Sequence, residues 1–256
     1  MLLAIDCGNT HIVAGVYKGD KLMRHWRLNS DSKKTEDEYM ILLSTLLEIE
    51  GWGISDIDAV AIASVVPAIT RLFQSLTREY FNIEAFVVDS TTDTGMPVLL
   101  DNPLEVGADR IINAVAAYKN YGGPLIVVDF GTATTFDCIS SAGEYLGGAI
   151  IPGMEISLEA LFAKAALLSK VPMMPPKNII GRSTAESLQV GMYWGFASQV
   201  DGIVNHLKKG LGATAKVIAT GGLARIIYDF SHSIEVCDPF LTLEGLKMVY
   251  QKSNKG

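Results

Sequence analysis

Short apolar runs alternate with longer segments of helical periodicity along this chain, and that alternation is typical of an α/β fold. In the first half, strands are expected at residues 2–5, 11–17, 22–28, 58–64 and 85–88. Helices are expected at residues 36–50, 67–80 and 104–121. Thr35 and Glu38 have the spacing of a capping box, which supports a helix start at that point.

The segment Gly122-Gly123-Pro124 interrupts this pattern, and we place a domain boundary beside it, giving domains 1–121 and 122–256. In the second domain, strands are expected at residues 125–128, 135–140, 145–151, 217–220 and near 235. Helices are expected at 154–167 and 184–209, with two shorter ones on either side of the last strand. The long helix carries an apolar stripe that we expect in the core, formed by Tyr193, Phe196, Ala197, Val200, Ile203, Val204 and Leu207.

The two halves share a short motif. Asp6-x-Gly8-Asn9-Thr10 and Asp129-x-Gly131-Thr132-x-Thr134 lie 123 residues apart, each after the first strand of its half and before a second strand. Few residues are shared, so a chance match is the alternative. The equivalent placement favours an internal duplication, with each motif at the tip of a hairpin.

Composition narrows the class of protein. The chain has 256 residues, of which 49% are hydrophobic and 19% charged, so it can bury a large core. A net charge of −7 argues against a general nucleic-acid binder. The start of the chain lacks the features of a signal peptide, and the longest apolar run, residues 59–69, is too short to span a membrane. Three widely spaced cysteines suggest a reducing compartment, so we expect a cytoplasmic protein without a disulfide framework or a zinc site.

The hairpin motifs have the chemistry of phosphate binding. Gly8 lets the backbone approach a phosphate, and Asn9 and Thr10 offer donors. Asp6 is suited to bind Mg²⁺ through water. An ordinary hairpin uses the same residue types, and the two motifs together are also compatible with two independent turns. If both act on one ligand, they would hold a triphosphate from opposite sides.

Two predicted helix N-termini are further candidates for binding a ligand or for catalysis. Asp109 is suited to accept a hydroxyl proton, and the Arg110 guanidinium to bind a substrate carboxylate. Ser183 and Glu186 have capping-box spacing. On spacing alone, a plain helix start is the favoured interpretation for Asp109 and Arg110. For Ser183 and Glu186, a plain helix start and a ligand contact are equally well supported. Gly191 and Gly195 on the long helix permit close approach of a second helix, as at a subunit interface.

Taken together, four segments in this order resemble the type III pantothenate kinases, which belong to the ATPase superfamily of sugar kinases, actin and heat-shock chaperones. They are Asp6-Cys7-Gly8-Asn9-Thr10, residues 102–110 (NPLEVGADR), residues 129–135 (DFGTATT) and Gly181-Arg182-Ser183-Thr184. Residues 147–153 (GGAIIPG) and 220–222 (TGG) also match the family. The resemblance implies two ribonuclease-H-like, actin-like ATPase domains with a cleft between them, assembled as a homodimer. It also implies transfer of the ATP γ-phosphate to pantothenate, the first step of coenzyme A synthesis.

The resemblance also implies site residues. Asp109 would be the general base, Asp129 a ligand of the potassium or ammonium ion, and Asp6 a water-mediated ligand of Mg²⁺. The ATP contacts would be Asp6, Cys7, Gly8, Asn9, Thr10, His11, Ile12, Val13 and Thr132. The pantothenate contacts would be Leu100, Gly107, Ala108, Asp109, Arg110 and Thr184, the last within or across the dimer. Leu100 departs from the family, which often has Tyr there.

Two other functions remain open at this point. One is another kinase of this superfamily that acts on a small hydroxylated acid or sugar; a substrate without a carboxylate would have little use for Arg110. The other is a nucleotide-dependent assembly or regulatory module, in which Asp109 would be dispensable for ATP binding and assembly.

Overall fold

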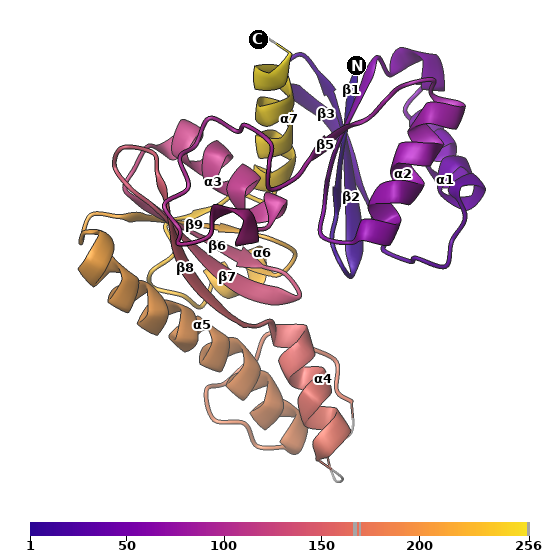
Figure 1. Cartoon of the computed structure of the whole chain (residues 1–256). Coiled ribbons are helices and arrows are strands. Elements are labelled where there is room, and N and C mark those ends of the chain that lie inside the picture. The colour runs from indigo at the N-terminus through magenta and orange to yellow at the C-terminus, as the bar shows by residue number, and fades with distance from the viewer. Residues whose placement is uncertain (166–167, 169, 255–256) are drawn as a thin grey trace. The chain divides into compact units, whose positions relative to one another are not determined.

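The computed structural model describes residues 1–165, 168 and 170–254 (Figure 1). The chain forms two compact units. Unit 1 comprises residues 1–96, 101–116 and 242–256, and unit 2 comprises residues 97–100 and 117–241. This division differs from the linear boundary expected at 121/122, because the C-terminal helix packs into unit 1 and a short segment before the third helix packs into unit 2.

Unit 1 is built on a mixed sheet with the strand order β3-β2-β1-β4-β5. The pairs β1–β2 and β2–β3 are antiparallel, whereas β1–β4 and β4–β5 are parallel. The strands are β1 (Leu2–Cys7), β2 (His11–Lys18), β3 (Lys21–Asn29), β4 (Ala59–Ser64) and β5 (Phe86–Val88). The helices are α1 (Glu36–Ile49), α2 (Pro67–Tyr80), α3 (Ala108–Tyr121, to residue 116 in this unit) and α7 (Leu241–Ser253), with 3-10 turns at Ile54–Asp56 and Pro103–Glu105.

Alternation along β1 sends its side chains to two different cores. Leu3 and Ile5 pack with α1 and α2, which cover one face of the sheet in Figure 1. Ala4 packs on the other face with Ile112 of α3 and Leu246 of α7. Since side chains repeat every second residue along a strand, Asp6 lies on the face that α3 covers.

Unit 2 repeats this architecture, with the strand order β10-β9-β6-β7-β8. The pairs β6–β7 and β7–β8 are antiparallel, and β6–β9 and β9–β10 are parallel, so each strand has a counterpart in unit 1. The elements are β6 (Leu125–Phe130), β7 (Ala133–Ile139), β8 (Tyr145–Pro152), α4 (Met154–Lys164), α5 (Thr184–Leu211), β9 (Lys216–Thr220), α6 (Ala224–Tyr228) and β10 (Val236–Cys237). The shared topology confirms the predicted α/β class and supports the predicted duplication.

The stripe expected on the long helix lies in the core of unit 2. Phe196, Val200 and Val204 are buried against Val128 and Phe136 of the sheet. Of the other stripe residues, Tyr193 and Ala197 are buried, and Ile203 and Leu207 are partly buried and pack against the same core. Among the described helices, none combines the length and apolar character needed to cross a bilayer.

Two expected helices have different bounds. The helix expected at 104–121 is split, because the Asn102 side chain caps a 3-10 turn, accepting from the N–H of Leu104 at 3.3 Å. The Gly107 carbonyl then accepts from the N–H groups of Arg110 and Ile111, at 3.1 and 3.3 Å, so α3 begins at Ala108. The helix expected at 154–167 is observed to Lys164, and residues 166 and 167 lie outside the described part of the chain.

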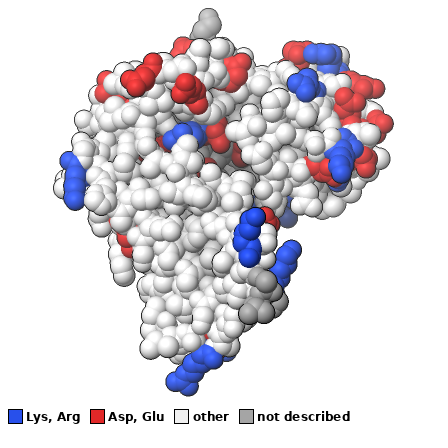
Figure 2. All heavy atoms as spheres, turned by 60° about the horizontal axis from the view of Figure 1, so that its bottom comes forward, with Lys and Arg blue, Asp and Glu red and all other residues white. Residues whose placement is uncertain are grey.

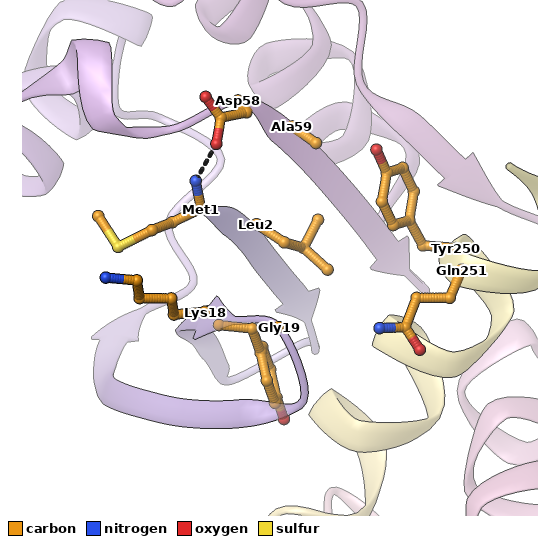
Figure 3. Close-up of a pocket in the computed structure, with 9 residues that line it drawn as sticks. Met1, Leu2, Lys18, Gly19, Asp58, Ala59, Tyr250 and Gln251 are labelled. Carbon is orange, nitrogen blue, oxygen red and sulfur yellow. Dashed lines mark hydrogen bonds and ion pairs between the residues drawn. The ribbon is translucent and has the colours of Figure 1, made fainter.

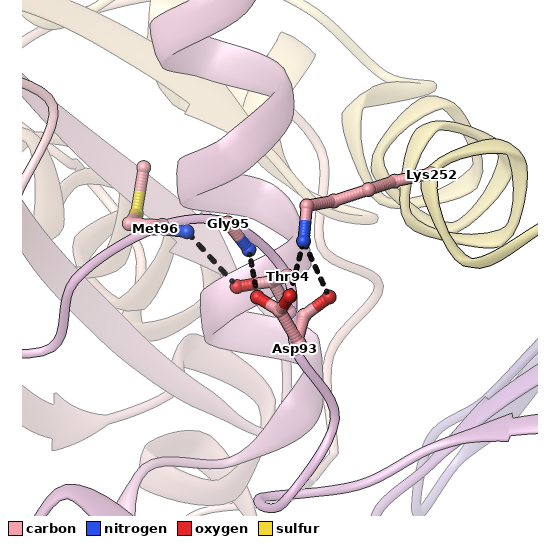
Figure 4. Close-up of polar contacts among 5 residues, drawn as sticks. All are labelled: Asp93, Thr94, Gly95, Met96 and Lys252. Atoms are coloured by element: carbon pink, nitrogen blue, oxygen red, sulfur yellow. Dashed lines mark hydrogen bonds and ion pairs between the residues drawn. The ribbon is translucent and has the colours of Figure 1, made fainter. Parts of the chain in front are cut away.

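Helix α7 is attached to unit 1 by apolar and polar contacts. The Lys252 ammonium bonds both the carboxylate and the carbonyl of Asp93 (Figure 4). Gly95 has φ +80°, and a Cβ there would lie 2.8 Å from Lys252 Cε. Lys247, 4% exposed, donates to the Asp20 carbonyl at 3.2 Å. These contacts explain why the end of the chain belongs to the first unit.

Candidate active site

The first hairpin tip has the form expected of a phosphate loop. The Gly8 N–H donates to the His11 carbonyl at 2.9 Å, which closes the turn between β1 and β2. A Cβ on Gly8 would lie 3.1 Å from that carbonyl oxygen, so a larger residue would crowd the turn. Asn9 and Thr10 are exposed at the tip. Their side chains and N–H groups can therefore reach an external anion.

The side chains around this tip divide into two groups. Cys7 and Ile12 are fully buried in the core with α1 and α2. Burial, together with the nearby Asp6 charge, holds the pKa of the Cys7 thiol well above its usual value, so the thiol stays neutral. These two residues can offer a ligand only their backbone. Asp6 and Val13 are register partners on the opposite face and are partly exposed.

Asp109 is the second residue of α3, and its carboxylate folds back over the helix start. Its Oδ1 accepts from the N–H of Arg110 at 2.9 Å. A Cβ on Gly107 would overlap this same Oδ1, so the arrangement requires glycine. Burial raises the pKa of Asp109, while the N–H and the charge of Arg110 act in the opposite direction. The result is a partly buried carboxylate with enhanced affinity for a proton.

The second hairpin tip is supported by a neighbouring loop. The Gly131 N–H donates to the Ala133 carbonyl at 3.1 Å, and the Gly153 N–H donates to the Thr132 carbonyl at 3.0 Å. A Cβ on Gly153 would overlap the Thr132 carbonyl, so the start of α4 packs closely on the tip. Gly131 and Thr132 are exposed. This hairpin thus presents a polar tip on a fixed base.

The expected pantothenate contacts fall in both units. Gly107, Ala108, Asp109 and Arg110 adjoin the α3 start in unit 1, whereas Leu100 and Thr184 belong to unit 2, as do Asp129 and Thr132. A Cβ on Gly147 of β8 would lie 2.9 Å from Leu100 Cδ2, so Leu100 packs over this strand.

Thr184 is exposed at the first residue of α5. The Ser183 hydroxyl accepts from the Glu186 N–H at 3.2 Å, as expected for the first half of a capping box. The Glu186 carboxylate accepts from the Arg182 N–H at 2.7 Å, one residue before the expected partner. By contrast, Thr35 and Glu38 form both bonds of their box.

A pocket that the sequence did not reveal lies at the other end of β1 (Figure 3). It has a volume of about 400 Å³ and is lined by Met1, Leu2, Tyr17, Lys18, Gly19, Asp58, Ala59, Tyr250 and Gln251. The Met1 ammonium pairs with the Asp58 carboxylate beside it. No expected site residue lines this pocket, since the phosphate loop follows the opposite end of the strand. The residues Lys18-Gly19-Asp20 indicate only a turn, so the sequence alone did not predict this pocket.

Comparison with known proteins identifies the family. The sequence profile described as type III pantothenate kinase matches residues 2–206. The chain is 49% identical over 255 residues to the type III pantothenate kinase of Geotalea uraniireducens, with complete coverage of both chains. It is 49% identical over 253 residues to that of Moorella thermoacetica, covering 99% of this chain and all of the relative.

A solved structure supports the fold independently. Component A of (R)-2-hydroxyglutaryl-CoA dehydratase from Acidaminococcus fermentans matches with a TM-score of 0.57 at 15% identity, covering 99% of this chain and 98% of that one. This likeness shows the fold alone, and it agrees with the two-domain α/β architecture that the sequence predicted. Full-length identity and the profile match together settle the family: the chain belongs to the type III pantothenate kinases.

Proposed function

We propose that this protein transfers the γ-phosphate of ATP to the primary hydroxyl of pantothenate, giving 4′-phosphopantothenate and ADP in the first step of coenzyme A synthesis. The observation that carries this proposal is the partly buried Asp109 carboxylate at the start of α3, with its raised pKa. It lies in the segment Gly107–Arg110, where an acid–base group and a carboxylate-binding group are adjacent. We also place the enzyme in the cytoplasm, because its three widely spaced cysteines are typical of a reducing compartment.

In the proposed reaction, the substrate hydroxyl oxygen forms a bond to the γ-phosphorus, and the bond from that phosphorus to the bridging oxygen of ADP breaks. The hydroxyl proton passes to the Asp109 carboxylate. Phosphoryl transfer has a loose transition state that mainly needs positioning and charge neutralisation. Asp109 therefore acts chiefly by orienting the hydroxyl and accepting its proton. The N–H of Arg110, 2.9 Å from Oδ1, holds the carboxylate for this task.

The nucleotide contacts follow from the two tips. Residues 6–13 bind phosphate oxygens, with Cys7 and Ile12 contributing backbone only, and Thr132 contacts ATP from the second tip. The first hairpin tip fits a hydrated Mg²⁺, because Asp6 offers one partly exposed carboxylate close to the turn at Gly8. When bound, Mg²⁺ neutralises phosphate charge. Asp129 is the ligand for potassium or ammonium.

Pantothenate carries a carboxylate, and the planar fork of Arg110 suits that group. Gly107 and Ala108 bring backbone close to the substrate, and Thr184 offers a hydroxyl. Leu100 is apolar where family members often have Tyr, so it supplies packing but no hydroxyl. We expect weaker binding of pantothenate than in relatives with Tyr at this position.

We also propose a homodimer. The described part of unit 2 exposes large apolar side chains at Ile150, Ile156, Leu161, Met174, Ile179 and Ile180. Figure 2 turns the α4 and α5 end of the chain toward the viewer and shows few charged side chains over most of that surface. Exposed apolar surface of this kind marks protein interfaces.

Light scattering tests the dimer. Ile180, 75% exposed, is replaced by Asp, and Ile49, 71% exposed at the end of α1, is replaced by Asp as the control. The wild type and Ile49→Asp should have the mass of two chains, and Ile180→Asp that of one. A wild type of single-chain mass would refute the dimer.

The function is tested by mass-spectrometric detection of phosphopantothenate from purified protein, pantothenate and MgATP. Asp109→Asn should lower kcat by about 10²–10⁴, because a general base contributes about that factor, while ATP binding is retained. Asp229→Asn removes an exposed carboxylate of unit 2 and should leave kcat unchanged. A protein that binds ATP and yields no phosphopantothenate would refute the assignment of substrate. Wild-type turnover in Asp109→Asn would remove that residue from the base role.

A further inference from the structure

A buried hydroxyl beside Asp129 lacks a hydrogen-bond partner. Thr220, the last residue of β9, is 1% exposed, and its Oγ1 makes no hydrogen bond with any of the described residues. Buried hydroxyls nearly always have a partner, since an unsatisfied one destabilises the fold. The position therefore suggests a ligand for this oxygen.

The strand register places Thr220 next to Asp129. The two residues are partners across the parallel pair β6–β9, and Thr135 is the partner of Asp129 across the antiparallel pair β6–β7. Partners on neighbouring strands direct their side chains to the same face of a sheet. The Asp129 carboxylate thus has a threonine hydroxyl on each side, on the face opposite Val128 and Phe130, which belong to the apolar core.

The Thr135 hydroxyl is oriented by a buried carboxylate. It donates its single hydrogen to Asp137 Oδ2 at 3.1 Å. Asp137 is fully buried and also accepts from the Tyr145 hydroxyl, at 2.6 Å. Because its hydrogen is directed to Asp137, the Thr135 oxygen presents lone pairs to other groups. Such an oxygen can act as a cation ligand.

Gly221 completes the surroundings of the carboxylate. It has φ +93°, and a Cβ there would overlap Asp129 Oδ1. The carboxylate oxygen consequently lies against bare backbone, in space that any side chain would fill.

The duplicated unit provides an internal comparison. Asp6 occupies the same place in β1 that Asp129 occupies in β6, one residue before the strand ends. Its partners across the neighbouring strands are Val13 and Ala63. The fold itself therefore does not require hydroxyls at these two positions. The hydroxyls are present beside Asp129 and absent beside Asp6, so they point to a role that is specific to the surroundings of Asp129.

We propose that Thr220 and Thr135 provide hydroxyl oxygens to the monovalent cation that Asp129 binds. This inference rests on the cation site of the proposed function and extends it to two further residues. One carboxylate with two neutral hydroxyls provides three oxygen ligands with a single negative charge, which matches a singly charged ion. Within the described ranges, no group of three or more His, Cys, Asp or Glu side chains is placed to hold a metal ion.

Potassium-dependent thermal stability tests the proposal without relying on activity. A ligand that binds only the folded state raises Tm as its concentration rises. Tm is measured against potassium chloride, with choline chloride holding the ionic strength constant. Because the stabilisation grows as RT ln(1 + [K⁺]/Kd), fitting the rise in Tm gives an apparent Kd for potassium. For Thr220→Val, this apparent Kd should be about 10–100-fold higher than for the wild type, as expected for loss of one contact to a charge. Without potassium, its Tm should equal or exceed that of the wild type, because an unsatisfied hydroxyl has become a methyl group.

Two further variants separate a ligand from a structural role. Thr220→Ser keeps the hydroxyl and should retain the wild-type potassium response. Thr77→Val removes a fully buried threonine hydroxyl of α2 that bonds the Gln74 carbonyl at 3.1 Å. It should lower Tm without changing the apparent Kd for potassium.

An unchanged apparent Kd for potassium in Thr220→Val would overturn the proposal. A wild type whose Tm does not respond to potassium would also overturn it. The phosphopantothenate assay on the same preparations keeps the two hypotheses apart. Product without a potassium response would leave the kinase assignment standing, and a potassium response without product would leave the cation site standing.

Discussion

Adding one methyl group to the chain beside Asp109 tests whether its carboxylate is held in a productive position. In Gly107→Ala, the new Cβ would overlap Asp109 Oδ1. Gly107 is not among the residues with positive φ, so alanine suits the backbone there. The substitution therefore acts on the carboxylate rather than on the path of the chain.

The expected magnitude follows from the required displacement. The carboxylate oxygen has to retreat by about 1 Å to reach the 3.4 Å at which ordinary van der Waals contact begins. That movement also weakens its 2.9 Å hydrogen bond from the Arg110 N–H. A misplacement of about 1 Å in a catalytic group can cost about 10² in rate. We therefore expect kcat for Gly107→Ala to fall by about 10²-fold.

The assay is ADP release at saturating ATP and pantothenate, measured together with Tm. Gly202→Ala in α5 is the matched control, since a Cβ on this exposed helical glycine meets nothing within 4 Å. It should leave kcat unchanged and stabilise the fold by about 0.5–1 kcal/mol. Wild-type kcat in Gly107→Ala would refute the reasoning, because the carboxylate would then tolerate displacement.

Three further predictions concern charge. Because burial raises the pKa of Asp109, kcat should fall as the pH is lowered, with an apparent pKa above 3.8, the ordinary value for Asp. An apparent pKa at or below 3.8 for this fall would contradict the prediction. For the same reason, Asp109→Asn should raise Tm near neutral pH, because the folded wild type keeps a partly buried charge there and the variant does not. This difference in Tm should vanish as the pH falls through the raised pKa, since Asp109 of the wild type then becomes neutral. Lys252→Met should lower Tm only slightly, since both partners of the ion pair with Asp93 are exposed. The difference should shrink in about 1 M NaCl, and a difference that persists there would contradict the ion pair as its source.

The sequence predicted the strands well, but it ended two of them too early at functionally important places. The apolar runs stop at Ile5 and Val128, so Asp6 and Asp129 were expected directly after the strands, at the start of the hairpin tips. In the structure both belong to strands, because the backbone ladder continues through Asp6–Val13 and Asp129–Thr135. Side-chain polarity reports burial, and it does not reveal where backbone pairing ends.

The assignment of α7 to a unit shows a second limit. Its apolar face predicts that the helix packs on a sheet, but both sheets offer apolar faces of similar character. The choice depends on tertiary contacts such as the close approach of Gly245 to the Ile112 backbone and the fit of Leu243 over Gly15. Such steric matches involve residues more than one hundred positions apart. Local patterns therefore cannot supply them.

The two halves of the chain show why motif matching found both aspartates but not the difference in their surroundings. Each aspartate stands one residue before the end of the central strand, with a glycine two residues later. Beside Asp6 the neighbouring strands place Val13 and Ala63, and beside Asp129 they place Thr135 and Thr220. These neighbours are distant in sequence, and their identity matters only once the register is known. A carboxylate flanked by apolar groups can reach a cation through water, whereas one flanked by hydroxyl oxygens can replace part of the water shell. Under the two proposals, the same position in the duplicated fold therefore binds a different ion in each unit, and the partners on the neighbouring strands decide which.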